Sequence, residues 1–245
     1  KELNLEISFI VRIILMSVRS MKTVGGALVV AQHGEIVYER YYGEQQKTTH
    51  VPVTENTYFK CASVTKLVTG IGLMKMMDEG ILDPDEDIST YLGYTVRNKR
   101  FMDTPITLRI LMSHTAGLVE NASFARKASI LSDMIDVEKK AGSNFKREVR
   151  PGSEYVYSNF GAGMTGAIVE SVTGMDVSSY MRQFLFEPLG IDAAYSASQL
   201  AEPEYIAATY KKDGSLYAAP SYMLRQEYLQ EHLLRFRKTE YRLLS

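Results

Sequence analysis

Cys61-Ala62-Ser63-Val64-Thr65-Lys66-Leu67-Val68-Thr69-Gly70 is the most informative segment of this 245-residue chain. Its apolar residues recur at helical spacing and Gly80 supplies a stop, so the pattern predicts a helix whose apolar stripe is Val64, Leu67, Val68, Ile71 and Met74. Positions i and i+3 share one face of a helix, so the Ser63 hydroxyl and the Lys66 amine are expected to meet there. A serine beside a basic group is the minimum for an activated nucleophile. The pair indicates a serine acyl-transfer hydrolase, or a large piece of one.

The Ser-x-x-Lys pattern is weak evidence when it stands alone, because it arises about once by chance in a chain of this length. A second copy, Ser143-Asn144-Phe145-Lys146, lies in a charged stretch with no apolar helix after it, and we interpret it as the chance copy. Taken singly, Ser63 could cap a helix and Lys66 could be a surface residue. The residues around Ser63 must therefore decide whether Ser63 and Lys66 form a catalytic pair.

Composition sets the broad class of the chain. Hydrophobic residues make up 45% and charged residues 23%, a globular balance, and the length suits one large domain or two small ones. The net charge of −1 gives no argument for a nucleic-acid partner. Cys61 is the only cysteine, so no internal disulfide is possible. The four histidines lack the paired spacing of a zinc site, and we expect no metal and no cofactor.

The first 60 residues predict a helix followed by a β-hairpin. The apolar run at residues 7–18, broken by Arg12, is too short to span a bilayer and is interpreted as a packed amphipathic helix; a signal-peptide remnant is the alternative. Residues 27–31 and 35–42 read as two strands joined by a tight turn at His33-Gly34.

Two patterns resemble ligand-binding motifs but lack the required context. The acids between Asp83 and Asp87 alternate as in a calcium loop, but Ile88 stands where glycine is required, so a solvated turn is expected. Gly161-Ala162-Gly163-Met164-Thr165-Gly166 matches a dinucleotide-binding pattern without the preceding apolar strand or the βαβ unit. We interpret its glycines as packing residues of a helix that ends at Gly174, and nucleotide binding is kept as the weakest hypothesis.

The C-terminal region is predicted to be a loop followed by a helix. Residues 192–220 read as loop with a turn at residues 212–214, and residues 222–244 read as one helix. Its candidate buried positions are Leu229, Leu233, Leu234 and Phe236. Its basic residues suggest a membrane surface or a partner, although a solvated face is the commoner explanation.

Three stretches in order resemble the serine penicillin-recognising family, specifically the branch of class C β-lactamases, D-alanyl-D-alanine carboxypeptidases and related esterases. The first is the Ser63-x-x-Lys66 motif itself. The second, residues 106–118, resembles an Ile-Thr…Leu-Leu-x-His-x-Ser-Gly-Leu segment, with Met112 and Ala116 where leucine and serine are usual. The third, Tyr157-Ser158-Asn159, resembles the branch's Tyr-x-Asn motif. The segment at residues 186–190 is also similar, and the resemblance covers about residues 25–194.

The resemblance implies an α+β fold of the β-lactamase/transpeptidase type, with a helical domain beside an antiparallel sheet that is incomplete in this chain. The expected division is an N-terminal helix (1–20), a hairpin contribution to the sheet (21–60), a mainly helical catalytic region (61–200), and a loop with a C-terminal helix (201–245). An α/β-hydrolase is disfavoured, because the chain has no Gly-x-Ser-x-Gly elbow.

The resemblance also implies a mechanism. Ser63 attacks a carbonyl to form an acyl-enzyme, Lys66 takes the proton if its amine is neutral, and Tyr157 relays protons to the leaving group. Asn159 hydrogen-bonds the substrate amide or the lysine, and the Ser63 N–H supplies half of an oxyanion hole. The implied substrates are D-Ala-D-Ala peptides, β-lactams or esters, and the implied location is the cell envelope or the extracellular space.

The family's third motif, Lys or His followed by Thr or Ser and Gly, is not found after Tyr157. Its strand supplies the second oxyanion donor, and losing one donor commonly costs about 10²–10³ in rate, so weak turnover is expected. The alternative function is a non-catalytic or impaired penicillin- or peptide-binding fragment. A hairpin without sheet partners also has an open edge, which suggests a homodimer through that edge.

Overall fold

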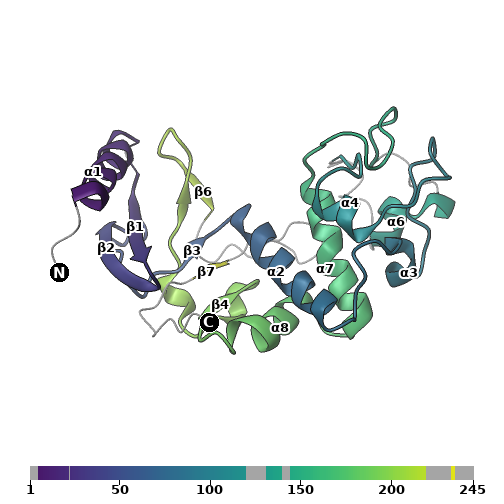
Figure 1. Ribbon diagram of the computed structural model, residues 1–245. Helices are drawn as coiled ribbons and strands as arrows, with labels where there is room; N and C mark the ends of the chain where they lie inside the picture. The colour runs from purple at the N-terminus through teal and green to yellow at the C-terminus, as the bar shows by residue number, and fades with distance from the viewer. Residues whose placement is uncertain (1–4, 22, 120–130, 140–143, 219–232, 235–245) are drawn as a thin grey trace. The chain divides into compact units, whose positions relative to one another are not determined.

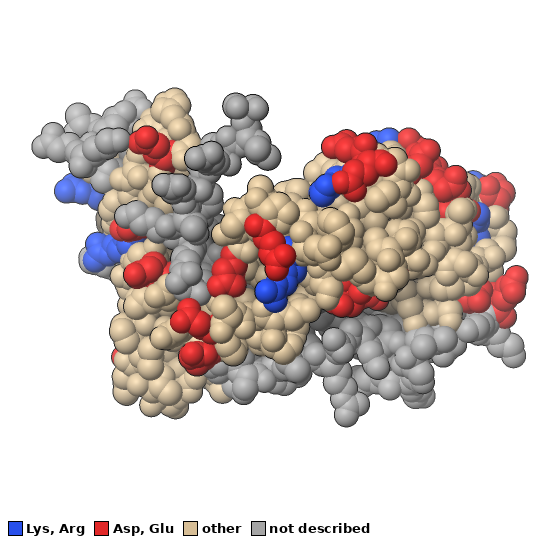
Figure 2. Space-filling view, turned by 90° about the horizontal axis from the view of Figure 1, so that it is seen from below, with Lys and Arg blue, Asp and Glu red and all other residues tan. Residues whose placement is uncertain are grey.

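The computed structural model of the protein describes residues 5–21, 23–119, 131–139, 144–218 and 233–234. The chain divides into two compact units (Figure 1). Among the described residues, the first unit contains 5–61 and those from 186 onward, and the second contains 62–185. On the face shown in Figure 2, the described basic side chains stand singly or in small groups among acidic and uncharged ones.

The first unit contains the hairpin that the sequence predicts. Strands β1 (Gly25–Gln32) and β2 (Glu35–Gly43) pair antiparallel, from Gly25 opposite Gly43 to Gln32 opposite Glu35, with an irregularity between Val30 and Ala31. His33 and Gly34 both have positive φ, at 51° and 77°. Two successive positive φ angles suit a two-residue turn whose twist matches that of the strands.

The helix predicted at the N-terminus is present as α1 (Leu5–Ser20), but the packing expected of it is largely absent. Val11 is its only buried residue among the described side chains, whereas Phe9, Ile13 and Met16 are exposed. None of the described helices is long and apolar enough to cross a membrane.

The remaining strands of the first unit correct the prediction for the C-terminal region. β7 (Leu233–Leu234) pairs antiparallel with both β3 (Phe59–Lys60) and β4 (Ala193–Ala194). β5 (Thr209–Tyr210) and β6 (Leu216–Ala218) form a second hairpin. Leu233 and Leu234 therefore lie in a strand, not in the predicted helix, because partners far away in sequence override the local helical pattern. The rest of 222–244, including Leu229 and Phe236, lies outside the described residues.

A small apolar core holds the strands of the first unit together. It contains Tyr58, Ala194, Leu200 and Ile206. The Tyr58 hydroxyl donates a 2.6 Å hydrogen bond to Asp192 Oδ2, and the Tyr58 backbone pairs with residues 205 and 207. This core is flanked by two short 3₁₀ helices, η3 (Ala197–Gln199) and η4 (Pro203–Tyr205).

The second unit is helical and is built around α7 (Asn159–Thr173), which contacts α2, α3, α4 and α8. The Ser158 hydroxyl caps the start of α7, and Gly174 ends it with φ 69°, as the sequence predicts. An added Cβ at Gly161 would come within 3.3 Å of Leu118, so this glycine permits close packing. The other helical segments are α2 (Val64–Asp78), α3 (Ile88–Leu92), α4 (Leu108–Met112), α6 (Leu131–Ile135), η1 (Val137–Lys139), α8 (Val177–Met181) and the π-helical turn Arg182–Phe186.

Helix α2 buries a different face from the one that its apolar stripe predicts. Val64, Leu67, Ile71 and Met74 are between 41% and 65% exposed. The buried residues are Thr65, Thr69, Gly72, Leu73 and Met76. Gly72 accounts for this choice, because an added Cβ there would meet the Met181 sulfur at 2.4 Å and glycine alone permits that approach.

Candidate active site

Ser63 stands at the N-terminal edge of α2 and does not cap that helix. Its backbone is helical, with φ −66° and ψ −14°, and its side chain makes no capping hydrogen bond. Instead, Ser63 Oγ lies 2.8 Å from the Tyr157 hydroxyl oxygen and 3.3 Å from Lys66 Nζ. The hydroxyl is thus directed toward two groups that can exchange protons with it.

Lys66 follows Ser63 by one helical turn, and its amine contacts both other groups. Nζ donates a hydrogen bond to Ser63 Oγ and lies 5.2 Å from the centroid of the Tyr157 ring. The Lys66 side chain is half-buried, while Ser63 is exposed. A serine hydroxyl, a lysine amine and a phenol therefore meet at one exposed point of the second unit.

Tyr157 is held by His114, a residue whose role no sequence motif indicated. The His114 ring lies 4.7 Å, centroid to centroid, from the Tyr157 ring, and His114 Nδ1 accepts a 3.3 Å hydrogen bond from the Ser158 N–H. The His114 carbonyl accepts another from the Val156 N–H at 2.7 Å. The only sequence signal for this contact was the presence of His114 within the segment at residues 106–118.

Two features of the backbone at Ser63 bear on its reactivity: the conformation of the preceding residue and the Ser63 amide hydrogen. Ala62 has φ 44°, a left-handed conformation that costs a residue other than glycine on the order of 1–3 kcal/mol. The strained residue directly precedes Ser63 and so fixes the direction in which the chain enters α2. Among the described residues, no acceptor takes the Ser63 amide hydrogen, so this N–H is available to an incoming oxygen.

Asn159 is the first residue of α7, two positions after Tyr157, and its side chain is half-buried. It belongs to the same unit as Ser63 and Lys66. The second Ser-x-x-Lys copy is arranged differently: Lys146 Nζ pairs with Glu154 Oε1 at 2.6 Å, and Ser143 lies outside the described residues.

The acidic turn that resembled a calcium loop is occupied by structural contacts. Asp87 caps α3 and pairs with Arg97, while Asp85 forms a bidentate pair with Arg109. Within the described part of the chain, no group of three or more His, Cys, Asp or Glu residues could hold a metal ion.

A family model described as Beta-lactamase matches residues 17–229, which include Ser63, Lys66, Tyr157 and Asn159. Among curated proteins, the chain is 30% identical to Esterase EstB of Burkholderia gladioli over 206 residues, covering 79% of this chain and 52% of the esterase. It is also 30% identical to a putative D-alanyl-D-alanine carboxypeptidase of Escherichia coli, covering 74% of this chain and 46% of that protein. The chain thus spans about half the length of these relatives.

A solved structure shows the same fold. The octameric penicillin-binding protein homologue from Pyrococcus abyssi superposes with a TM-score of 0.71 at 21% identity, over 95% of this chain and 54% of that one. The fold is therefore of the β-lactamase/transpeptidase type, a mixed α+β architecture whose described strands form small antiparallel sheets.

Proposed function

The chain belongs to the beta-lactamase family, and from this premise we propose that it is, or is part of, a serine hydrolase or acyltransferase that forms an acyl-enzyme at Ser63. One observation supports the proposal above the others: Ser63 Oγ lies within hydrogen-bonding distance of both Tyr157 and Lys66. A serine hydroxyl needs such a base to become a competent nucleophile.

In the proposed reaction, Ser63 Oγ attacks the carbonyl carbon of the substrate. The hydroxyl proton passes, directly or through the Tyr157 oxygen, to the Lys66 amine, which accepts a proton only in its unprotonated form, and the carbonyl oxygen becomes an oxyanion. When the intermediate collapses, the bond to the leaving group breaks, that group takes a proton from Tyr157, and Lys66 returns a proton to the Tyr157 oxygen. An ester to Ser63 remains, and water or another acceptor then attacks it by the reverse proton movements.

The remaining roles concern stabilisation of charge and alignment of the substrate. We assign the Ser63 N–H as one oxyanion donor, supported by its position at the start of α2, where the helix dipole favours negative charge. We assign Asn159 to a hydrogen bond with the substrate or with Lys66, on the basis of its place two residues after Tyr157.

The proposed substrates are carbonyl compounds with a good leaving group or a strained amide. Relatives named as an esterase and as a putative D-alanyl-D-alanine carboxypeptidase support small esters and D-Ala-D-Ala peptides, and the family itself supports β-lactams. The exposure of Ser63 and Tyr157 supports access by any of them.

The second candidate is a protein that binds such compounds and is acylated but turns over poorly. It is a candidate for these 245 residues by themselves, which after Tyr157 contain no Lys or His followed by Thr or Ser and Gly. An oxyanion held by one donor in place of two is expected to react about 10²–10³ times more slowly.

Intact-mass measurement after incubation with a fluorescent penicillin and with an activated ester tests the proposal. We expect one covalent adduct per chain, lost in Ser63→Ala and kept in Ser143→Ala, which removes the serine of the other Ser-x-x-Lys copy. Loss of the adduct over time with release of product supports the hydrolase, and a persistent adduct supports the second candidate. An adduct that survives Ser63→Ala, or no adduct with either reagent, contradicts both.

A further inference from the structure

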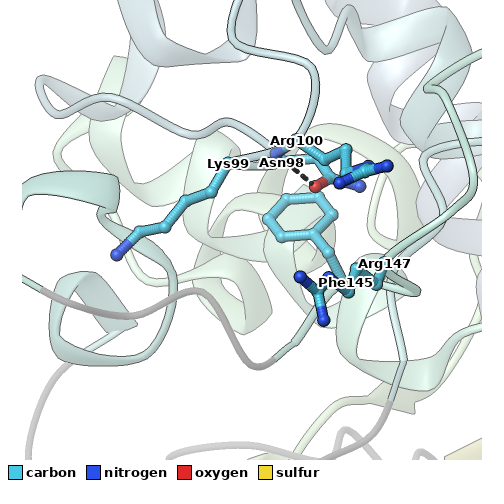
Figure 3. Close-up of a pocket in the computed structure, with 5 residues that line it drawn as sticks. All are labelled: Asn98, Lys99, Arg100, Phe145 and Arg147. Carbon is cyan, nitrogen blue, oxygen red and sulfur yellow. Dashed lines mark hydrogen bonds between the residues drawn. The ribbon is translucent and has the colours of Figure 1, made fainter.

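A basic pocket lies in the second unit, apart from Ser63, Lys66 and Tyr157. Its volume is about 540 Å³, and its lining residues are Asn98, Lys99, Arg100, Phe145 and Arg147 (Figure 3). Three of these carry positive charge and none is acidic. The lining comes from two segments, the turn at residues 98–100 and the loop at residues 145–147, so the pocket exists only where these segments meet.

Asn98 ties the two segments together at the base of the pocket. It is 3% exposed, and its Nδ2 donates hydrogen bonds to the carbonyls of Lys146 at 3.3 Å and Val149 at 3.2 Å. Its Oδ1 accepts the Arg100 N–H at 3.1 Å, the bond drawn in Figure 3. Phe145 is also buried. The basic side chains therefore project from a fixed framework.

Glu148 shows that two of these cations can share one carboxylate. Its oxygens lie 3.4 Å from Arg100 Nε and 3.9 Å from Arg147 Nε. The three side chains are 53%, 83% and 70% exposed for Arg100, Arg147 and Glu148, and ion pairs as exposed and as long as these contribute little. An anion from solution that reaches both guanidinium groups at shorter distances can therefore displace Glu148 or join it.

The charge balance around the pocket is positive. The cations next to the lining are already paired, Lys146 with Glu154 and Arg150 with Asp103. Among the described residues, Lys99 has no ion-pair partner and Glu148 is the one carboxylate that pairs with a lining cation, so a single negative charge stands against three positive ones. A surplus of two positive charges remains.

We propose that this pocket binds a small polyanion through carboxylate or phosphate groups. Arg100 and Arg147 supply planar donor pairs that match the oxygens of either group, and Lys99 adds a third charge. Two or more negative charges on the ligand balance the surplus, which a monoanion leaves half compensated. Since Arg100 and Arg147 come from different segments, the bound anion also joins the turn at residues 98–100 to the loop at residues 145–147. That loop leads toward Tyr157 along the chain.

Isothermal titration calorimetry with citrate, inorganic phosphate and acetate, at one low ionic strength, tests the proposal. We expect citrate or phosphate to bind at one site and acetate to bind much more weakly. Arg147→Gln should weaken the binding about fivefold, and Glu148→Gln should strengthen it about twofold or more, because that change removes the competing carboxylate. Both side chains are exposed, so folding should be unaffected, which an unchanged unfolding midpoint verifies.

Arg12→Gln is the matched control, since it removes the same charge from the exposed surface of α1 in the other unit. It should leave the affinity unchanged. Binding of citrate alone identifies carboxylates as the recognised groups, and binding of phosphate alone identifies phosphates. The proposal is overturned if neither polyanion binds, if Arg12→Gln and Arg147→Gln weaken binding equally, or if Glu148→Gln weakens it. None of these outcomes depends on acylation of Ser63.

Discussion

The hydroxyl oxygens of Ser63 and Tyr157 lie 2.8 Å apart, although 94 residues separate them in the sequence. Either oxygen can donate the hydrogen, and Lys66 Nζ donates to the serine oxygen at 3.3 Å. A proton leaving Ser63 therefore has two possible acceptors. The importance of each can be measured, because one atom can be removed from the tyrosine while its ring stays in place.

Tyr157→Phe should slow acylation of Ser63 by an activated ester about 10²-fold or more, since it removes a proton-transfer group and keeps the ring contacts with His114 and Lys66. Time-resolved intact-mass measurement gives this rate. Tyr155→Phe is the control, because the Tyr155 ring also contacts His114, with centroids 5.9 Å apart, but the proposed mechanism gives its hydroxyl no role. Equal slowing in both variants would argue against a role for the Tyr157 oxygen.

His114 should act as a positioning residue for Tyr157. His114→Ala removes both the ring contact and the acceptor for the Ser158 N–H, and we expect acylation to slow about tenfold or more. His114→Phe keeps a ring and loses only the acceptor, so it should fall between Ala and the unaltered protein. In the Tyr157→Phe background, His114→Ala should have a much smaller effect. If the two effects instead multiply, His114 acts independently of Tyr157.

Thr65 should destabilise the protein through its hydroxyl. Thr65 Oγ1 is buried and has no hydrogen-bond partner among the described residues, whereas Thr69, one turn later and equally buried, donates to the Thr65 carbonyl at 3.1 Å. Thr65→Val should raise the free energy of unfolding by about 1 kcal/mol, and Thr69→Val should lower it by about the same amount. Urea denaturation measures both, and a loss of stability in Thr65→Val would contradict the assignment.

Asp87 should make stability depend on pH at the acid end. Burial raises the pKa of this carboxyl, but hydrogen bonds from Arg97 and from the Ser89 N–H outweigh it, so the pKa lies below its ordinary value of 3.8. A lowered pKa contributes stability above the unfolded value of 3.8 and loses it as pH falls through the folded value. Asp87→Asn should therefore lower the free energy of unfolding by about 1–2 kcal/mol at neutral pH, and by progressively less below about pH 4.

Asp85→Asn provides the comparison for Asp87. Asp85 also pairs with an arginine, Arg109, and its pKa is also lowered, chiefly by that hydrogen bond, but both side chains are largely exposed. Exposed pairs contribute little, so its removal should change the free energy of unfolding much less than Asp87→Asn does, at any pH. The free energy of unfolding of both variants, measured at several pH values, tests these expectations. A larger loss in Asp85→Asn than in Asp87→Asn would contradict both.

Local signals predicted the local structure well. The hairpin follows from His33-Gly34, and the end of α7 follows from Gly174. Each depends on residues within a few positions of one another, where backbone preference and capping decide the conformation. The resemblance to the penicillin-recognising family could also be recognised locally, because its motifs are short and contiguous. The match to the family model confirms it.

Three features that depend on distant partners were not predicted. The periodicity of α2 identified an apolar stripe, but Gly72 and its contact with Met181 decide which face packs. Leu233 and Leu234 have a helical context in sequence, yet they pair with strands that begin at residues 59 and 193. The support of Tyr157 by His114 spans 43 residues (157 minus 114) and involves a ring contact that leaves no periodic signal.

The exposed stripe of α2 bears on the fate of an acylated Ser63. Val64 and Leu67 each directly follow a residue of the proposed mechanism, Ser63 or Lys66, and their apolar side chains are exposed. Solvent that wets this stripe also has access to an ester formed at its end, which favours hydrolysis. Shielding these side chains from solvent would also reduce the access of water to the ester carbonyl. The acyl-enzyme would then last longer, and an alcohol or amine would compete with water as the acyl acceptor.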